Sequence, residues 1–187
     1  MKKNLLISLK LTAILIILLA ILYPLLLAAV GRFAAGNGGA EKLMVNGKVV
    51  GYANIGQKFT DDKYFWGRPS AVDYNAAGSA GSNKGPSNPD YLKLVQDRID
   101  SFLVHNPAVK RNEIPADIVT ASGSGLDPDI SPAAALIQVN RVAQARNINS
   151  NKINELVKAH IEKPFLGLFG PSKVNVLKLN IALEQIH

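Results

Sequence analysis

The chain has 187 residues, a formal net charge of +7 and no cysteine. The lack of cysteine excludes disulfide cross-links, thiolate metal sites and cysteine nucleophiles. The 21 basic residues are scattered, without a basic block or an interleaved aromatic ladder, so the composition argues against nucleic-acid binding.

The first predicted element is an apolar run near the N-terminus. No charged residue occurs between Leu11 and Gly31. About 20 helical residues at about 1.5 Å each cover the roughly 30 Å of a bilayer's hydrocarbon core. A cleaved signal peptide is the alternative, but its apolar region would be only about 7–15 residues long. We therefore predict an uncleaved transmembrane helix at 11–31, since membrane helices tolerate a proline such as Pro24.

The lysines predict the orientation of this helix. Lys2, Lys3 and Lys10 precede the run, and Arg32 is the only basic residue among the ten that follow it. Because positively charged flanks stay on the cytoplasmic side, residues 1–10 are predicted to be a short cytoplasmic N-terminus. The rest of the chain is then extracytoplasmic, and its length of about 155 residues is enough for one compact core.

The extracytoplasmic part is predicted to begin with a flexible neck at 32–41, which is rich in glycine and alanine. Residues 42–187 are predicted to form one α+β domain, with a small sheet and several helices. Asn46-Gly47 stands between two β-branched runs and predicts a tight hairpin. Residues 76–90 have few large apolar side chains, which predicts a long loop.

Three helices and two further strands follow in the prediction. Asn88 before Pro89 and Ser131 before Pro132 are typical of helix starts, with a capping side chain before a proline at the first helical position. The predicted helices cover about 89–105, 132–146 and 150–163. The predicted strands cover 114–120 and 174–179, and a short helix is expected to finish the chain.

The stretch TASGSGLDPDISPAAA at 120–135 raises the question of catalysis. Ser122 and Ser124 lack the Gly-x-Ser-x-Gly spacing of a hydrolase elbow, and no P-loop pattern is present. Asp127 and Asp129 have neither an EF-hand spacing nor a histidine pair beside them, so no metal site is predicted. We interpret the stretch as a shaped turn, capped by Ser131 and available as a contact element through Ser122, Ser124 and Asp127.

The stretch YFWGRP offers a second candidate interface. Tyr64, Phe65, Trp66 and Arg68 are of the residue types that anchor protein–protein interfaces. The alternative is that these aromatic side chains fill the domain's own core. The sequence leaves both interpretations open.

Taken in order, five segments resemble one known family. They are YFWGRPSA, SNKGPSNP, DIVTASGSGLDPDISPAAA, RVAQAR and VNVLKLN, and they follow an N-terminal single span. Together they resemble the C subunit (KdpC) of the bacterial Kdp potassium-transporting P-type ATPase complex, over nearly the whole chain. The Asp-Lys-Thr-Gly signature of the pump subunit is absent, because Asp62-Lys63 is followed by Tyr64-Phe65.

The resemblance implies a non-catalytic accessory subunit of an ATP-driven, high-affinity potassium uptake complex in the bacterial cell (inner) membrane. Its partners would be a channel-like potassium-binding subunit, a P-type ATP-hydrolysing subunit, a small single-span subunit and the lipid bilayer. The subunit would be needed for assembly and stability. It would also act as a catalytic chaperone that raises the ATP affinity of the pump subunit, with Gln138 as the residue that contacts ATP. No cofactor would be firmly bound.

The predicted topology and the ATP contact conflict, because an extracytoplasmic domain lies where ATP is scarce. Two other functions stay open from the residues. One is a membrane-anchored extracytoplasmic binding or sensing module without a pump partner. The other is an anchored hydrolase that depends on Ser122 or Ser124.

Overall fold

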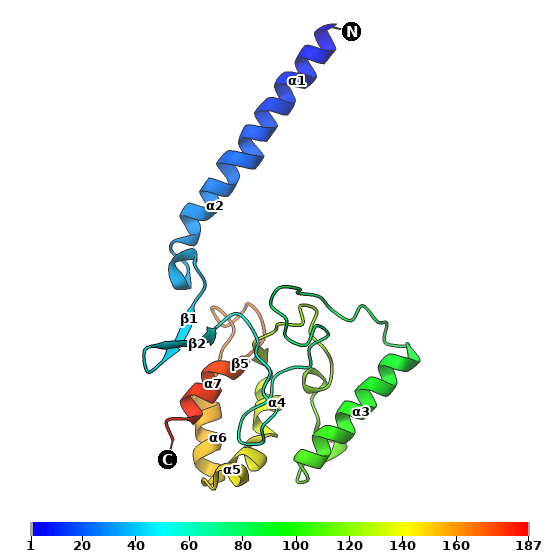
Figure 1. Cartoon of the computed structure of the whole chain (residues 1–187), viewed down its shortest axis with the longest axis vertical. Coiled ribbons are helices and arrows are strands. Elements are labelled where there is room, and N and C mark those ends of the chain that lie inside the picture. The colour runs from blue at the N-terminus through cyan, green and yellow to red at the C-terminus, as the bar shows by residue number, and fades with distance from the viewer. Residues whose placement is uncertain (1, 187) are drawn as a thin grey trace. The chain divides into compact units, whose positions relative to one another are not determined.

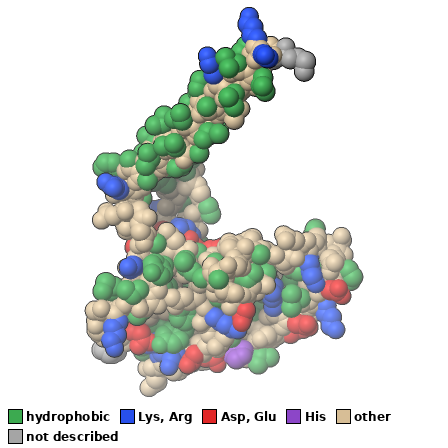
Figure 2. All heavy atoms as spheres, turned by 45° about the horizontal axis from the view of Figure 1, so that its top comes forward, with side chains coloured by type: hydrophobic (Ala, Val, Ile, Leu, Met, Phe, Trp, Pro, Cys, Tyr) green, Lys and Arg blue, Asp and Glu red, His purple; other side chains and the backbone are tan. Residues whose placement is uncertain are grey.

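The structure is a computed structural model that describes residues 2–186, which divide into two compact units between Lys42 and Leu43 (Figure 1). The first unit is mainly one continuous helical run, composed of α1 (Lys2–Ile16), a π-helical turn η1 (Ile17–Leu22) and α2 (Tyr23–Gly31). At 30 residues it is long and apolar enough to cross a membrane. Figure 2 shows apolar side chains along it and lysines near its N-terminal end.

The π-helical turn has a local cause. Pro24 has no N–H to donate to the carbonyl four residues earlier, and its ring crowds that carbonyl. The turn before it widens, so that the N–H of Tyr23 donates to the carbonyl of Leu18, five residues back. This adjustment carries the helix past the proline without ending it.

The hairpin predicted at Asn46-Gly47 is confirmed. β1 (Lys42–Val45) and β2 (Lys48–Tyr52) form a two-stranded sheet. Asn46 and Gly47 have φ values of +51° and +76°, as a type I′ turn requires. A short 3₁₀ turn, η2 (Ala35–Gly38), precedes the hairpin.

Between β2 and α3 (Pro89–His105), residues 53–88 form turns and bends but no helix or strand, which confirms the loop predicted at 76–90 up to residue 88. The start of α3 is also as predicted. The Asn88 side chain accepts a hydrogen bond from the N–H of Tyr91 at 3.0 Å, and Pro89 occupies the first turn.

The strand predicted at 114–120 is wrong. The chain forms a 3₁₀ turn there, η4 (Ala116–Ile118), and another, η3 (Arg111–Glu113), lies just before it. Consecutive residues Ile118 and Val119 are both buried, which an alternating strand with one buried face would not allow. Asp117 fixes the turn, since its carboxylate accepts hydrogen bonds from the N–H and the hydroxyl of Ser131.

The predicted helix from Pro132 is present but divided, and the predicted strand 174–179 is mostly helical. The C-terminal helices are α4 (Pro132–Leu136), α5 (Val139–Arg146), α6 (Ser150–Ala159) and α7 (Val176–Leu183). A turn at Ile137-Gln138 separates α4 from α5. The Asn175 side chain caps α7 by accepting from the N–H of Lys178 at 3.0 Å, so the strand ends there.

A three-stranded antiparallel sheet accompanies these helices. Its order is β3 (Asp129–Ile130), β5 (Lys173–Asn175) and β4 (Ile161–Glu162), and Val174 of the central strand pairs with both neighbours. The core lies among α4 to α7 and this sheet, with Val142, Ile153, Val157, Leu179 and Leu183 fully or almost fully buried. One core side chain, Phe65, comes from the irregular segment before α3.

Candidate functional site

Two buried amide side chains hold the segment that contains Phe65 and Trp66. The Asn180 side chain accepts from the N–H of Phe65 at 2.9 Å and donates to its carbonyl at 3.0 Å. Gln138 makes the same pair of bonds with Trp66, accepting at 2.8 Å and donating at 3.2 Å. Each amide therefore replaces one step of a β-ladder for a segment that has no strand partner. The separations along the chain are 115 and 72 residues.

Gln138 uses its full hydrogen-bonding capacity within the domain. Its side chain is completely buried. Besides its two bonds to Trp66, it donates to the carbonyl of Ala134 at 2.9 Å and accepts from the Arg141 guanidinium at 2.7 Å. A glutamine amide has two donors and two acceptor positions, and all four are occupied. In this conformation Gln138 can contact another molecule only if the Trp66 segment first moves away.

Arg141 is the centre of the network. It is 5% exposed, and its guanidinium lies 4.2 Å from the centre of the Trp66 ring. It donates to four groups: the carbonyl of Asp62 at 2.6 Å, the carbonyl of Tyr64 at 3.0 Å, Oδ1 of Asn106 at 3.1 Å and Oε1 of Gln138. Burial lowers the pKa of Arg141 to about 10, against the attraction of the Asp62 carboxylate, so it stays charged at neutral pH.

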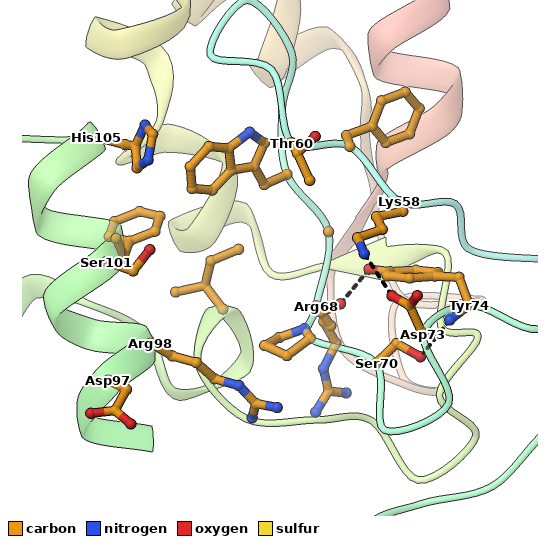
Figure 3. Close-up of a pocket in the computed structure, with 16 residues that line it drawn as sticks. Lys58, Thr60, Arg68, Ser70, Asp73, Tyr74, Asp97, Arg98, Ser101 and His105 are labelled. Atoms are coloured by element: carbon orange, nitrogen blue, oxygen red, sulfur yellow. Dashed lines mark hydrogen bonds and ion pairs between the residues drawn. The ribbon is translucent and has the colours of Figure 1, made fainter. Parts of the chain in front are cut away.

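A groove of about 550 Å³ runs between α3 and the chain from Lys58 to Tyr74. Figure 3 shows Arg98, Ser101 and His105 of α3 on one side of it and Arg68, Ser70 and Tyr74 on the other. Trp66 contributes to the lining, and its ring centre lies 4.9 Å from that of His105. Aromatic and cationic side chains thus line the groove together with Asp73, Asp97 and several hydroxyl groups, and Trp66 connects the groove to Gln138 and Arg141.

The polar groups of the groove are tied to the domain. The Arg68 guanidinium forms an ion pair with Asp127 at 3.0 Å, and the Arg98 guanidinium donates to the carbonyl of Val119 at 3.1 Å. Burial lowers the pKa of Arg98. The Tyr74 hydroxyl donates to the carbonyl of Arg68, and burial, helped by the nearby Asp127, raises the pKa of Tyr74 to about 12.

The Gly/Ser stretch at 120–131 is a turn stabilised by its own side chains. Three of these accept from backbone N–H groups two or three residues later: Ser122 from Gly125 at 2.9 Å, Ser124 from Leu126 at 3.1 Å and Asp127 from Asp129 at 3.0 Å. The predicted cap is confirmed, because Ser131 Oγ accepts from the N–H of Ala134 at 3.1 Å. Among the described residues, no histidine is hydrogen-bonded to Ser122 or Ser124. The bonds of these two serines are those of a turn.

The predicted interface residues occupy different environments. Phe65 is fully buried and belongs to the core, which was the alternative left open by the sequence. Tyr64, Trp66, Arg68 and Asp127 are partly exposed, whereas Ser122 is buried and Ser124 is exposed on the turn. The Arg68–Asp127 pair joins the two predicted patches.

Sequence reasoning missed Arg141, Asn106 and Asn180 as parts of the site. A signal was present for one of them. Arg141 follows Gln138 by three residues and so shares its helical face, next to Val142 and Ala143, which the sequence predicts to face inward. A charged residue on a core-facing stripe indicates a buried partner network.

Comparison with known proteins adds the family. The family described as "KdpC: K+-transporting ATPase, c chain" matches residues 5–185. A Flavobacterium psychrophilum protein named Potassium-transporting ATPase KdpC subunit is 58% identical over 184 residues, covering 98% of this chain and 99% of the relative. Proteins of the same name from Bacteroides fragilis and Bacillus cereus are 54% and 45% identical, and cover 98% and 95% of this chain and 98% and 93% of their own lengths.

Proposed function

The chain belongs to the KdpC family, the c chain of K+-transporting ATPases, and from this premise we propose that it is a non-catalytic accessory subunit of an ATP-driven potassium uptake complex. One observation carries the proposal. Three polar side chains of the site could in principle bind a ligand or take part in catalysis: Gln138, Arg141 and Asp127. All three instead hydrogen-bond to other groups of the domain. Such an arrangement favours a rigid contact surface over a reactive centre.

We propose that the soluble domain stabilises the complex by contact with a partner subunit. The partners expected are a channel-like potassium-binding subunit, a P-type ATP-hydrolysing subunit and a small single-span subunit. Trp66 and Arg68 line the groove and are only partly buried. Trp and Arg dominate the energetics of many protein interfaces, so the groove is the surface we assign to this contact.

Omission of the chain tests this function. We expect that a complex purified through its ATP-hydrolysing subunit, from cells lacking this chain, loses the channel-like subunit or its potassium-stimulated ATPase activity. Both should return when the full chain is supplied. The double variant Ser122→Ala/Ser124→Ala should restore them equally, which separates an accessory subunit from an anchored hydrolase that depends on either serine. Normal transport by a complex without the chain would refute the function, and recovery of no multi-span partner would favour a binding or sensing module.

We also propose that the soluble domain is extracytoplasmic, since the lysines cluster at residues 2–10. The chain has no cysteine, so single cysteines report their own side of the membrane. In intact spheroplasts, a membrane-impermeant maleimide should label Val104→Cys, whose native side chain is 77% exposed. It should label Asn4→Cys only after lysis. The opposite pattern would place the domain with ATP in the cytoplasm.

We propose that this chain raises the ATP affinity of the ATP-hydrolysing subunit indirectly, by changing how the subunits of the complex fit together. A direct contact by Gln138 would require breaking four hydrogen bonds inside the domain. It would also require the domain to lie on the side of the membrane where ATP is abundant. A change in how the partner subunits fit together requires neither.

A further inference from the structure

The loop between β4 and β5 presents an apolar tip, defined here as residues 165–169 (Phe-Leu-Gly-Leu-Phe). Phe165, Leu166, Leu168 and Phe169 are 71%, 74%, 81% and 64% exposed. None of the four belongs to the domain's core cluster. Four large apolar side chains on one short loop are a concentrated patch, unlike scattered single exposed residues, which need no explanation.

The tip has a defined conformation. The N–H of Phe165 donates to the carbonyl of Phe169 at 2.9 Å, and the N–H of Phe169 donates back at 3.0 Å. Leu166 and Gly167 turn the chain with φ values of +54° and +74°. A leucine with positive φ is uncommon because its Cβ crowds the backbone. The fold therefore holds these side chains outward, at a conformational cost that burial in its own core does not offset.

Four of the five backbone N–H groups of the tip donate to carbonyls of the same loop. The N–H of Gly167 donates to the carbonyl of Pro164 at 2.9 Å, and that of Leu168 to Phe165 at 3.1 Å. Together with the two bonds between Phe165 and Phe169, these pair the N–H groups of residues 165, 167, 168 and 169 without water. Internal pairing of this kind is what an apolar solvent demands, because an unpaired backbone group in hydrocarbon costs several kcal/mol.

Charge surrounds the tip but does not enter it. No charged residue lies from Pro164 to Ser172, whereas Lys163 and Lys173 flank the stretch on its two sides. Lys173 is held by Asp129 at 2.6 Å, and hydrogen bonding to that carboxylate raises the pKa of Lys173. Lys173 is also ion-paired with Glu162 at 3.6 Å, so the exposed Lys163 is the cation that we expect at headgroup level. An apolar end with a lysine at its base is typical of segments that enter a bilayer interface.

We propose that the apolar tip inserts into the interfacial region of the lipid bilayer in which this chain's own helix is anchored. The first unit supplies a helix able to cross a membrane, and its apolar run ends at Gly31. The next 11 residues, extended at about 3.5 Å each, reach at most about 40 Å. A domain of this size has a radius of gyration of about 15 Å, so the tether keeps every face of it within reach of the lipid.

The chemistry of the tip favours lipid over a protein partner. Anchors at protein interfaces are enriched in Trp, Tyr and Arg, which combine apolar area with hydrogen bonds. The side chains of the tip offer no donor or acceptor, and lipid acyl chains require none. The proposed depth is shallow, about 5–10 Å below the headgroup–acyl boundary.

Depth-dependent quenching tests the proposal on the full chain. The cysteine-free sequence allows a bimane label at Leu166→Cys, with Val104→Cys as the control because it is equally exposed and lies at the end of α3. The protein is reconstituted into phosphatidylcholine–phosphatidylglycerol vesicles containing lipids with a nitroxide near the glycerol backbone. We expect several-fold stronger quenching and a blue-shifted emission at position 166, and neither at 104. Equal, weak quenching at both positions overturns the proposal.

A second variant distinguishes insertion from chance proximity. With the label at Phe169→Cys, the added changes Leu166→Ser and Leu168→Ser should return quenching to the level of the Val104 control. These positions are exposed, so the changes leave the core intact. Unchanged quenching contradicts insertion by the tip. The proposal is also overturned if, in the assembled complex, the label at 166 is shielded from lipid nitroxides and a photoreactive probe there cross-links to another subunit.

Discussion

Replacing Gln138 by leucine is expected to lower the free energy of unfolding of the soluble domain by about 4 kcal/mol. Leucine has a similar volume, so the loss comes from polar groups and not from a cavity. The N–H and carbonyl of Trp66, the carbonyl of Ala134 and one Arg141 donor lose their partner. Each buried group left unpaired costs about 1–3 kcal/mol. Urea unfolding of the full chain in detergent, followed by Trp66 fluorescence, measures the change.

The matched control is Gln144→Leu, the same chemical change at an exposed position of α5. It should shift the unfolding midpoint little, because surface substitutions usually stay within about 0.5 kcal/mol. Trp66 is the only tryptophan, so the signal comes from the network itself. A Gln138→Leu chain as stable as the Gln144→Leu chain would contradict the assigned role.

The same variant separates an indirect effect on ATP from a direct one. In the assembled complex, Gln138→Leu should change the ATP concentration for half-maximal activity by no more than a variant of matched stability. Ile153→Ala is such a variant, since removing a buried isoleucine side chain costs about 2–5 kcal/mol without touching a polar group. A loss of ATP affinity confined to Gln138→Leu would support contact between Gln138 and nucleotide.

Replacing Arg141 by methionine is expected to destabilise the domain by about 3–5 kcal/mol, the usual consequence of removing one member of a buried charged network. Methionine keeps much of the volume but donates no hydrogen bond. The carbonyls of Asp62 and Tyr64 and the side chain of Asn106 would each lose a buried donor. The Trp66 ring would lose the cation that lies over it. Thermal unfolding and Trp66 emission should both change.

Arg111→Met is the control for this prediction, because Arg111 is exposed and its contact with Asp100 at 3.7 Å is a surface ion pair. Such pairs contribute at most about 1 kcal/mol. The two variants share the same net charge, so long-range electrostatics cancel in the comparison. If both lower stability equally, the network around Arg141 does not hold the Trp66 segment.

Local signals predicted part of this fold well. The cap of α3 by Asn88, the cap of α4 by Ser131 and the turn at Asn46-Gly47 each depend on a few neighbouring residues. These caps and this turn can therefore be predicted from a few consecutive residues of the sequence. The division between α4 and α5 has no such marker, because Ile137-Gln138 continues the helical pattern. Gln138 leaves the regular helix where its side chain bonds to Trp66.

The site could be predicted only in pieces. The sequence singled out Phe65 and Trp66 as interface or core, and could not decide, because Asn180 and Gln138 lie 115 and 72 residues away. Asn175 was hidden within a run that alternates like a strand, although it caps α7. The apolar tip has neither period 2 nor period 3.6, so periodicity assigns it no structure, and only its exposure distinguishes it.

The amide bonds to Phe65 have a consequence for folding kinetics. Asn180 accepts from and donates to the backbone of Phe65, which lies 115 residues earlier in the sequence, and Phe65 and Leu183 belong to the same core cluster. Closing so long a loop is entropically costly, and contacts of high sequence separation slow folding. The core around Phe65 is therefore expected to form late, after the local turns and helices.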